Sequence, residues 1–151
     1  MMQITVHGNP APQGSKRFVG HAKNGRGLMI ESSKAVRPWR EAVKWAALEA
    51  LEPHELSIGR HCNGALVGAV RVEMIFTVPK PKSAPKRRQT LPDRKPDLSK
   101  LIRSTEDALT DAGVWEDDAR VISCTAHKVY PGEGVDSLPV PGAIIRIEAV
   151  E

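Results

Sequence analysis

Cysteine is scarce in this sequence, and long apolar runs are absent from it. The 151 residues include two cysteines, Cys62 and Cys124, and neither lies in a Cys-x-x-Cys pair or a Cys/His cluster. This pattern excludes a disulfide framework and gives no zinc signature, so we expect two buried free thiols. No stretch approaches the roughly 20 apolar residues that span a bilayer, and residues 1–8 lack the pattern of a signal peptide. The sequence therefore predicts a cytoplasmic protein without a membrane partner.

Charge is distributed unevenly along the chain. Residues 1–44 carry eight Lys or Arg against two Glu, and residues 80–103 carry nine Lys or Arg against two Asp. Residues 104–151 instead carry three basic against ten acidic side chains. Clustered cations favour a polyanionic partner, most commonly nucleic acid. We interpret the acidic section either as a solvated surface or as a source of metal-binding carboxylates.

Hydrophobic periodicity predicts a single α+β domain over residues 1–151. Alternating apolar residues predict strands, expected at residues 3–6, 67–78, 120–129 and 143–149. The dipeptide Asn24-Gly25 predicts a hairpin between residues 18–19 and 28–30. Apolar residues at helical spacing predict helices at about 37–51 and at 98–112, with Trp39 and Trp45 as packing residues of the first. The order predicts two layers, with two helices on one face of a mixed β-sheet.

Residues 79–96 are predicted to form a flexible basic loop. They contain five prolines among 18 residues and seven Lys or Arg. A loop of this length without helix or strand is uncommon in a compact domain and is usually functional or disordered. We interpret its cations as contacts to a DNA backbone, together with two in the N-terminal Gly-Ser loop; these residues are Lys86, Arg87, Arg88, Arg94, Lys95, Lys16 and Arg17. An exposed tether without a ligand is the alternative.

Acidic residues flank the second predicted helix. Asp97 stands at its entrance, and Asp117-Asp118 follow its exit, directly before a strand. If that strand runs back beside the helix entrance, Asp97 meets one of the later pair. Mg²⁺ prefers carboxylate oxygens, and two carboxylates that share one ion lie within roughly 8 Å. The structural alternatives are a helix cap for Asp97 and a turn for Asp117-Asp118.

The same region resembles the RusA family of crossover junction endodeoxyribonucleases. The family pattern is close to K-P-D-x-D-N-L-x-K, then D-A-L, then a Gly and an aromatic residue, then D-D-x-x-V. The matching residues are Lys95, Pro96, Asp97, Leu101, Asp107, Ala108, Leu109, Gly113, Trp115, Asp117, Asp118 and Val121. The resemblance implies a RusA-like fold and a homodimer that resolves four-way (Holliday) junctions by paired nicks, in DNA recombination and repair.

Carried over residue by residue, the resemblance implies that Asp97 and Asp118 are catalytic carboxylates that bind Mg²⁺, with Mn²⁺ as an alternative ion. Asp117 is then a neighbouring acidic residue at the metal. No small-molecule cofactor is implied, and the origin implied is bacterial, phage or prophage. Trp115, the aromatic residue of the pattern, either packs in the core or stacks on an exposed base.

The sequence departs from the family pattern at three positions of this helix. Ser99 replaces the second Asp, Lys100 replaces the Asn, and Arg103 takes the place of the catalytic Lys. Arg103 stays protonated, so as a catalytic residue it stabilises phosphate charge rather than donating a proton, and Lys100 is expected near the phosphate. Glu106 shares a helical stripe with Ser99 and Arg103 and lies two turns, or roughly 11 Å, beyond Ser99. We hypothesise that Glu106 supplies the missing carboxylate; a solvated surface residue is the alternative.

Three functions are compatible with these residues. The first is a Mg²⁺-dependent, structure-selective endonuclease, whose activity the Ser99 replacement reduces. The second is a protein that binds branched DNA and no longer cuts it, for the same reason. The third is an RNA-binding or ribonucleolytic protein, because no residue in the sequence discriminates the 2′-hydroxyl.

Overall fold

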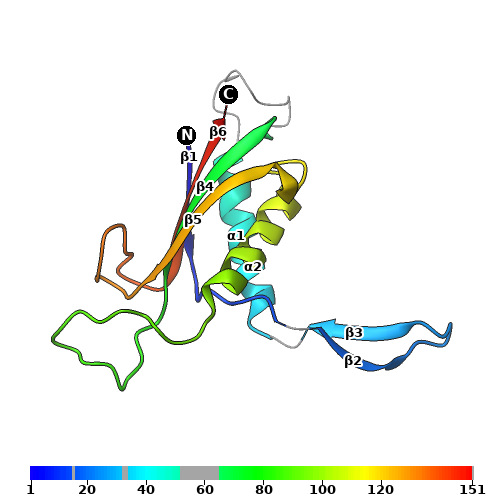
Figure 1. The fold of residues 1–151 in the computed structure, drawn as a ribbon, viewed down its shortest axis with the longest axis horizontal. Coiled ribbons are helices and arrows are strands. Elements are labelled where there is room, and N and C mark those ends of the chain that lie inside the picture. The colour runs from blue at the N-terminus through cyan, green and yellow to red at the C-terminus, as the bar shows by residue number, and fades with distance from the viewer. Residues whose placement is uncertain (15, 32–33, 52–64, 151) are drawn as a thin grey trace.

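The computed structural model describes residues 1–14, 16–31, 34–51 and 65–150 (Figure 1). The elements, in chain order, are β1 (Met2–His7), β2 (Lys16–His21), β3 (Gly27–Glu31), α1 (Val36–Leu51), β4 (Ala69–Thr77), α2 (Leu98–Asp111), the short 3₁₀ helix η1 (Asp118–Arg120), β5 (Val121–Val129) and β6 (Gly142–Val150). The predicted order of strands and helices is confirmed. The sequence did not predict η1, and Cys62 lies outside the described residues.

Four strands form the main sheet in the order β1-β6-β4-β5. β6 pairs antiparallel with both β1 and β4, whereas β5 pairs parallel with β4. Parallel neighbours need a crossover, which α2 provides between β4 and β5. Both helices lie on one face of the sheet (Figure 1). These observations confirm the two-layer α+β architecture with a mixed sheet.

The core lies between this face of the sheet and the two helices. Alternate residues of β4 are fully buried there, as predicted for a central strand: Val70, Val72, Met74 and Phe76. Trp39 of α1 is buried and donates a hydrogen bond from Nε1 to Oγ1 of the buried Thr105 in α2, at 3.2 Å. Trp115 is also buried and donates from Nε1 to Oγ1 of Thr110, at 2.8 Å. The packing interpretation of Trp115 is therefore confirmed over base stacking.

Two expectations about burial are wrong. Trp45 is 63% exposed, because six residues of helix place it about 120° around the axis from Trp39. Cys124 is a free thiol but is exposed, because it lies on β5, the edge strand of the sheet. Within the described part of the chain, no helix is long and apolar enough to cross a membrane.

β2 and β3 form a separate two-stranded hairpin that projects from the body of the molecule (Figure 1). Gly25 in its turn has a φ of +79°, a conformation that L side chains rarely adopt. Phe18, Val19 and Leu28 on the hairpin are exposed. The predicted hairpin is thus confirmed, and these three apolar side chains do not belong to the core.

Candidate active site

Asp97 lies at the N-terminal entrance of α2 with its carboxylate exposed. Its backbone is extended, and its side chain makes no capping hydrogen bond among the described residues. The carboxylate Oδ2 lies 3.7 Å from Nζ of Lys100, three residues further on. The structural alternative of a capping role is therefore not realised, and Asp97 presents a charged oxygen pair beside a cation.

Lys128, near the end of β5, fixes the segment that leads into Asp97. Its Nζ donates hydrogen bonds to the carbonyl oxygens of Arg94, at 2.7 Å, and Pro96, at 2.9 Å. An ammonium group bonded to two carbonyl oxygens holds this irregular segment in one position. Sequence reasoning missed Lys128, because only the parallel pairing of β5 with β4 brings its side chain to the helix entrance.

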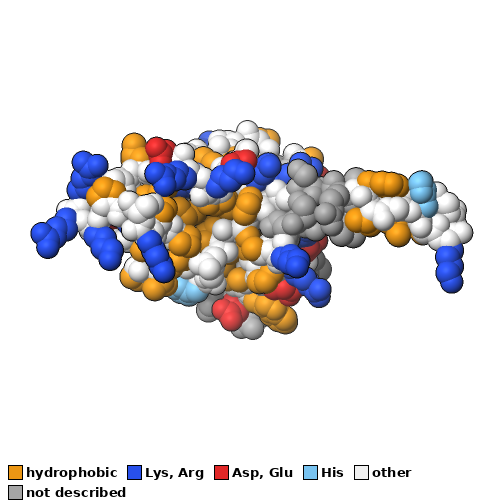
Figure 2. Space-filling view, turned by 90° about the horizontal axis from the view of Figure 1, so that it is seen from below, with side chains coloured by type: hydrophobic (Ala, Val, Ile, Leu, Met, Phe, Trp, Pro, Cys, Tyr) orange, Lys and Arg blue, Asp and Glu red, His pale blue; other side chains and the backbone are white. Residues whose placement is uncertain are grey.

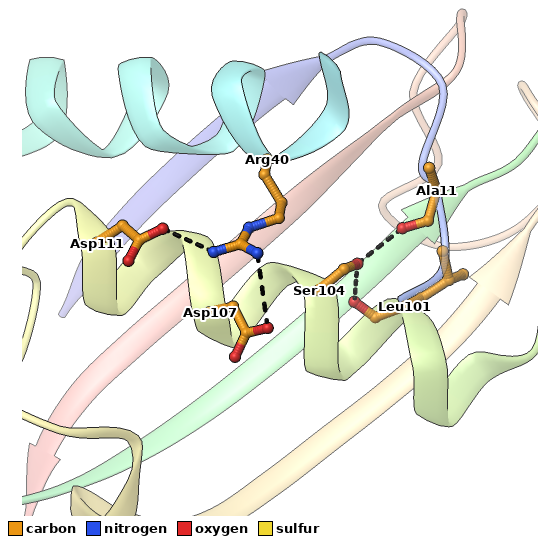
Figure 3. Close-up of polar contacts among 6 residues, drawn as sticks. All are labelled: Ala11, Arg40, Leu101, Ser104, Asp107 and Asp111. Atoms are coloured by element: carbon orange, nitrogen blue, oxygen red, sulfur yellow. Dashed lines mark hydrogen bonds and ion pairs between the residues drawn. The ribbon is translucent and has the colours of Figure 1, made fainter. Parts of the chain in front are cut away.

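The N-terminal loop packs against the other side of the same entrance. Ser104 is buried and donates from Oγ to the carbonyl oxygen of Ala11, at 2.7 Å, and also to that of Leu101, at 3.1 Å (Figure 3). The backbone N–H of Gln13 donates to the carbonyl oxygen of Lys100, at 2.9 Å. These bonds bring the chain just before the basic residues Lys16 and Arg17 to the entrance of α2. The side chains of those two residues lie outside the described structure.

A second acidic group lies where α2 ends and β5 begins. Asp118 is the exposed first residue of η1, and Glu106 is a half-buried residue of α2. Burial raises the pKa of the Glu106 carboxyl, and the negative charges of Asp118 and then Asp107 raise this pKa further. Asp117 caps η1, since its Oδ1 accepts a hydrogen bond from the N–H of Ala119 at 2.7 Å. The turn alternative is thus realised for Asp117, whose place at a metal stays a prediction.

In one chain, α2 stands between Asp97 and Asp118. The helix has 14 residues, equivalent to about 21 Å of axial rise. β5 does run back beside α2, as predicted, but Asp118 lies at the start of β5, whereas it is the end of β5 that contacts Pro96. The structure therefore does not bring Asp97 and Asp118 together within one chain. Among its described residues, no three Asp, Glu, His or Cys side chains are grouped so that they could hold a metal ion.

Asp107, which matches the D-A-L motif, faces α1 rather than Asp97. Arg40 of α1 lies between two carboxylates of α2: its Nη1 is 3.9 Å from Oδ2 of Asp107, and its Nη2 is 2.7 Å from Oδ2 of Asp111 (Figure 3). These ion pairs link the two helices. Sequence reasoning missed Arg40, although the spacing of four residues between Asp107 and Asp111 places both on one helical face.

The basic loop has neither helix nor strand, as predicted. Two of its residues are hydrogen-bonded to Glu133, which lies outside the loop. Glu133 accepts a short hydrogen bond from Nζ of Lys80 and a second one, at 3.5 Å, from the N–H of Thr90. Lys80 also donates to the carbonyl oxygen of Arg88, at 3.3 Å. The hydrogen bond from Lys80 is the largest cause of the lowered pKa of the Glu133 carboxyl. No pattern in the sequence indicated this contact, and the flexibility of the loop stays a prediction.

Lys and Arg side chains gather at the end of the molecule that the basic loop forms, and others lie along the middle of the same face (Figure 2). In the loop, the side chains of Lys86, Arg87, Arg88 and Lys95 are exposed. Arg94 is also exposed and contacts Oγ of Ser83 through Nη1, at 3.4 Å. Exposed cations spread across one face fit the phosphates of an extended polyanion.

A comparison with protein families gives a match to the family described as endodeoxyribonuclease RusA, over residues 7–136. The match covers 130 of the 151 residues and includes the basic loop, both ends of α2 and all of β5. No curated protein matches the chain.

Proposed function

This chain belongs to the endodeoxyribonuclease RusA family, and we propose that it is a structure-selective endonuclease that resolves four-way DNA junctions by paired nicks. One observation carries the proposal: the family match runs through Asp97, Asp118 and the basic loop. A four-way junction has two-fold symmetry, and paired nicks require two sites, so a homodimer is part of the proposal.

The reacting site, in this proposal, combines carboxylates from two chains. Within one chain, the charge of Asp118 adds to the rise in the pKa of Glu106 that burial causes, whereas Asp97 stands at the entrance of α2. A second copy supplies its Asp97 to the first pair. Glu106 belongs to the chain that contributes Asp118. It takes the place of the Asp that the family pattern has where this chain has Ser99.

This donor set fits a hard divalent cation. All three groups are carboxylates. The pKa of Glu106 is raised by burial first and then by the negative charges of Asp118 and Asp107, and a bound cation would offset those charges. When bound, Mg²⁺ or Mn²⁺ supplies an activated water and neutralises charge on the scissile phosphate. The chain's own residues position the DNA: Arg103 and Lys100, both exposed on α2, contact the phosphate beside the cut.

Mixed dimers test the two-chain site. An Asp97→Asn chain and an Asp118→Asn chain, co-expressed with different tags, each form inactive homodimers. Their heterodimer has one site with both substitutions and one intact site, so we expect nicking of one strand of a labelled junction. The matched control combines wild type with the Asp97→Asn/Asp118→Asn chain, where both sites of the heterodimer are damaged. Both heterodimers are purified by their two tags before the assay. Activity in the control heterodimer but not in the first heterodimer places each site within a single chain and contradicts the proposal.

A metal titration tests the role of Glu106. We expect Glu106→Gln to raise the Mg²⁺ concentration for half-maximal cutting by about tenfold or more, because one ligand becomes neutral. Glu116→Gln is the matched control, since Glu116 is exposed and already paired with Arg120 at 2.7 Å. Equal Mg²⁺ dependence in the two variants removes Glu106 from the site.

The second candidate function is junction binding without cutting. It rests on Ser99 and Arg103, which replace an Asp and a Lys of the family pattern. Incubation of the purified protein with labelled junction, duplex and single-stranded DNA, and with matching RNA, with and without Mg²⁺, separates the candidates. Nicks confined to the DNA junction with Mg²⁺ support the nuclease. Binding without nicks supports the second candidate, in which case Ser99→Asp is expected to restore cutting.

A further inference from the structure

Residues of the basic loop and Tyr130, the residue after β5, line two adjoining clefts. The larger cleft has a volume of about 450 Å³ and the smaller one about 180 Å³. Thr90, Leu91 and Tyr130 line both of them, so the two clefts meet. Ligand sites in proteins are typically clefts of about 300–1,000 Å³. The larger cleft therefore has room for a ligand, and neither Asp97 nor Asp118 lines it.

The walls of the larger cleft combine apolar surface with hydrogen-bonding groups. Tyr130 is buried, so its ring belongs to the inner wall of the cleft. Pro85 and the exposed Leu91 add apolar surface. The amide of Gln89 offers a hydrogen-bond donor and an acceptor, and the carboxylate of Asp93 offers acceptors. Apolar walls with a few polar groups fit a flat heteroaromatic ring such as a nucleobase.

Positive charge surrounds this cleft. The basic loop contains seven Lys or Arg and a single acidic residue, Asp93. Two of the cations, Arg88 and Arg94, line the cleft itself. Arg94 also contacts Oγ of Ser83 at 3.4 Å, which joins two sides of the cleft wall. Clustered cations attract a polyanion, so the ligand that fits both the walls and the charge is a base carried on a nucleic acid backbone.

The cleft lies next to the entrance of α2. Arg94 precedes Asp97 by three residues, and three residues of extended chain span at most about 11 Å. Lys128 holds this segment through its hydrogen bonds to the carbonyl oxygens of Arg94 and Pro96. Successive nucleotides of one DNA strand advance by about 3.4 Å along the helix axis. A base in the cleft is therefore within a few nucleotides of a phosphate at Asp97.

We propose that the larger cleft receives one unpaired nucleobase of the DNA junction, a few nucleotides from the phosphate that is cut. The inference rests on the proposed function for its substrate. The ring of the base packs against Tyr130 and Leu91, its polar edge faces Gln89 and Asp93, and the cations of the loop hold the flanking phosphates. A base whose pairing is already weakened, as at a branch point, leaves its stack at low cost.

The fluorescence of 2-aminopurine tests the cleft without any cutting. A set of four-way junctions carries this base analogue at single positions within three nucleotides of the branch point. The full-length protein is added in EDTA, which removes divalent ions, and the fluorescence of each junction is recorded. Because unstacking raises the fluorescence of the analogue, we expect a rise of twofold or more at one or two positions. No rise at any position overturns the proposal.

A variant that fills the cleft tests where the base goes. Ala84 lines the larger cleft, and Ala84→Phe adds a ring there without changing any charge. We expect this variant to lose the fluorescence rise and to raise the Kd for the junction by about tenfold, because the contacts to one base are lost. The slope of log Kd against log salt concentration should stay unchanged, because all the cations remain. A rise equal to that of wild type overturns the proposal.

The matched control for this variant is Val140→Phe. It places the same ring at a position that is 50% exposed and lines neither cleft. We expect it to keep both the fluorescence rise and the Kd of wild type. A loss of the rise in Val140→Phe as large as in Ala84→Phe overturns the assignment to the cleft.

A second variant decides the matter if Ala84→Phe also changes the salt slope, which would indicate a displaced loop. Leu91 is 84% exposed, so Leu91→Ala costs the fold little. We expect it to reduce the fluorescence rise, because one wall of the cleft is removed. Val135→Ala is its control, at a position that is 83% exposed. Equal rises in these two variants overturn the proposal.

The outcomes separate this inference from the proposed function. A rise that Ala84→Phe abolishes, in a protein that cuts no junction with any divalent ion, supports the cleft and contradicts the nuclease proposal. Cutting with Mg²⁺ by a protein that gives no rise overturns the cleft and leaves the nuclease proposal standing. A free deoxynucleoside monophosphate that abolishes the rise at micromolar concentration, while the junction stays bound, assigns the cleft to free nucleotides and overturns the inference.

Discussion

Lys128 bonds to the carbonyl oxygen of Pro96 at 2.9 Å, and this contact joins the end of β5 to the residue before Asp97. Lys128→Met keeps the aliphatic chain but removes the ammonium group and two hydrogen bonds. A hydrogen bond from a charged group is worth roughly 1.5–3 kcal/mol. We therefore expect kcat for junction cutting to fall by about tenfold or more, with a smaller change in KM, because Asp97 loses its fixed position.

Single-turnover kinetics on a labelled junction measure this effect. Lys82→Met is the control, since Lys82 is an exposed cation of the basic loop. If the two variants cut at the same rate, Lys128 does not position Asp97.

Arg87 and Arg88 are exposed in the basic loop, and we predict that both contact DNA phosphates. Each phosphate contact contributes about 0.9 to the slope of log Kd against log salt concentration. Replacing both residues with Ala should reduce this slope by about two and weaken the binding of all DNA sequences uniformly. Fluorescence anisotropy over a range of salt concentrations measures the slope, and an unchanged slope shows that the pair does not touch the backbone.

Glu133 should stabilise the fold only where its carboxylate is ionised. Its pKa is lowered in the folded protein, mainly by the hydrogen bond from Lys80. The contribution is therefore complete above the ordinary pKa of Glu and is lost as the pH falls through the lowered value. We expect Glu133→Gln to reduce the free energy of unfolding at neutral pH, with the difference from wild type shrinking in acid.

Urea unfolding at several pH values measures this difference, and trypsin provides a second readout, since the loop is rich in Lys and Arg. We expect faster cleavage within residues 79–96 in Glu133→Gln at neutral pH. Glu148→Gln is the control, because Glu148 is exposed and paired with Arg71 at 3.5 Å. A constant difference at all pH values contradicts the assigned cause.

Gly142 begins β6, where that strand pairs with His7 of β1. A Cβ at this position would lie 2.1 Å from the carbonyl oxygen of Val6 and 2.8 Å from Cδ1 of Leu138. Backbone cannot move aside as a side chain does, so Gly142→Ala should destabilise the protein by about 1–3 kcal/mol. Thermal unfolding measures the loss, with Ala143→Gly as a comparison that opens space instead. An unchanged Tm in Gly142→Ala shows that β1 and β6 separate without cost.

The fold could be predicted where one residue pattern decided each element. β4 alternates over its whole length and is central, and α2 carries a continuous apolar stripe that is buried. The prediction that Trp45 is a packing residue was wrong because residues six apart in a helix face different directions. The prediction that Cys124 is buried was wrong because its exposure depends on β5 being the edge of the sheet, which only the order of strands determines.

The candidate site was harder to predict than the fold. Sequence spacing placed Asp97 and Asp118 at the two ends of α2, which the structure retains. Whether they meet depends on which end of the following strand lies beside the helix entrance, and spacing does not determine that. No local pattern indicated the contacts of Arg40, Lys128 and Glu133. Each of these residues contacts a partner that is 32 or more residues away in the sequence.

The placement of Asp97 and Asp118 at opposite ends of one helix has a consequence for how cutting activity depends on the amount of protein in the cell. If cutting needs carboxylates from two copies, a single molecule is inert on any DNA it meets, and activity rises with the square of abundance at low expression. A cell that holds few copies is thereby protected from stray breaks, and dilution alone silences the enzyme.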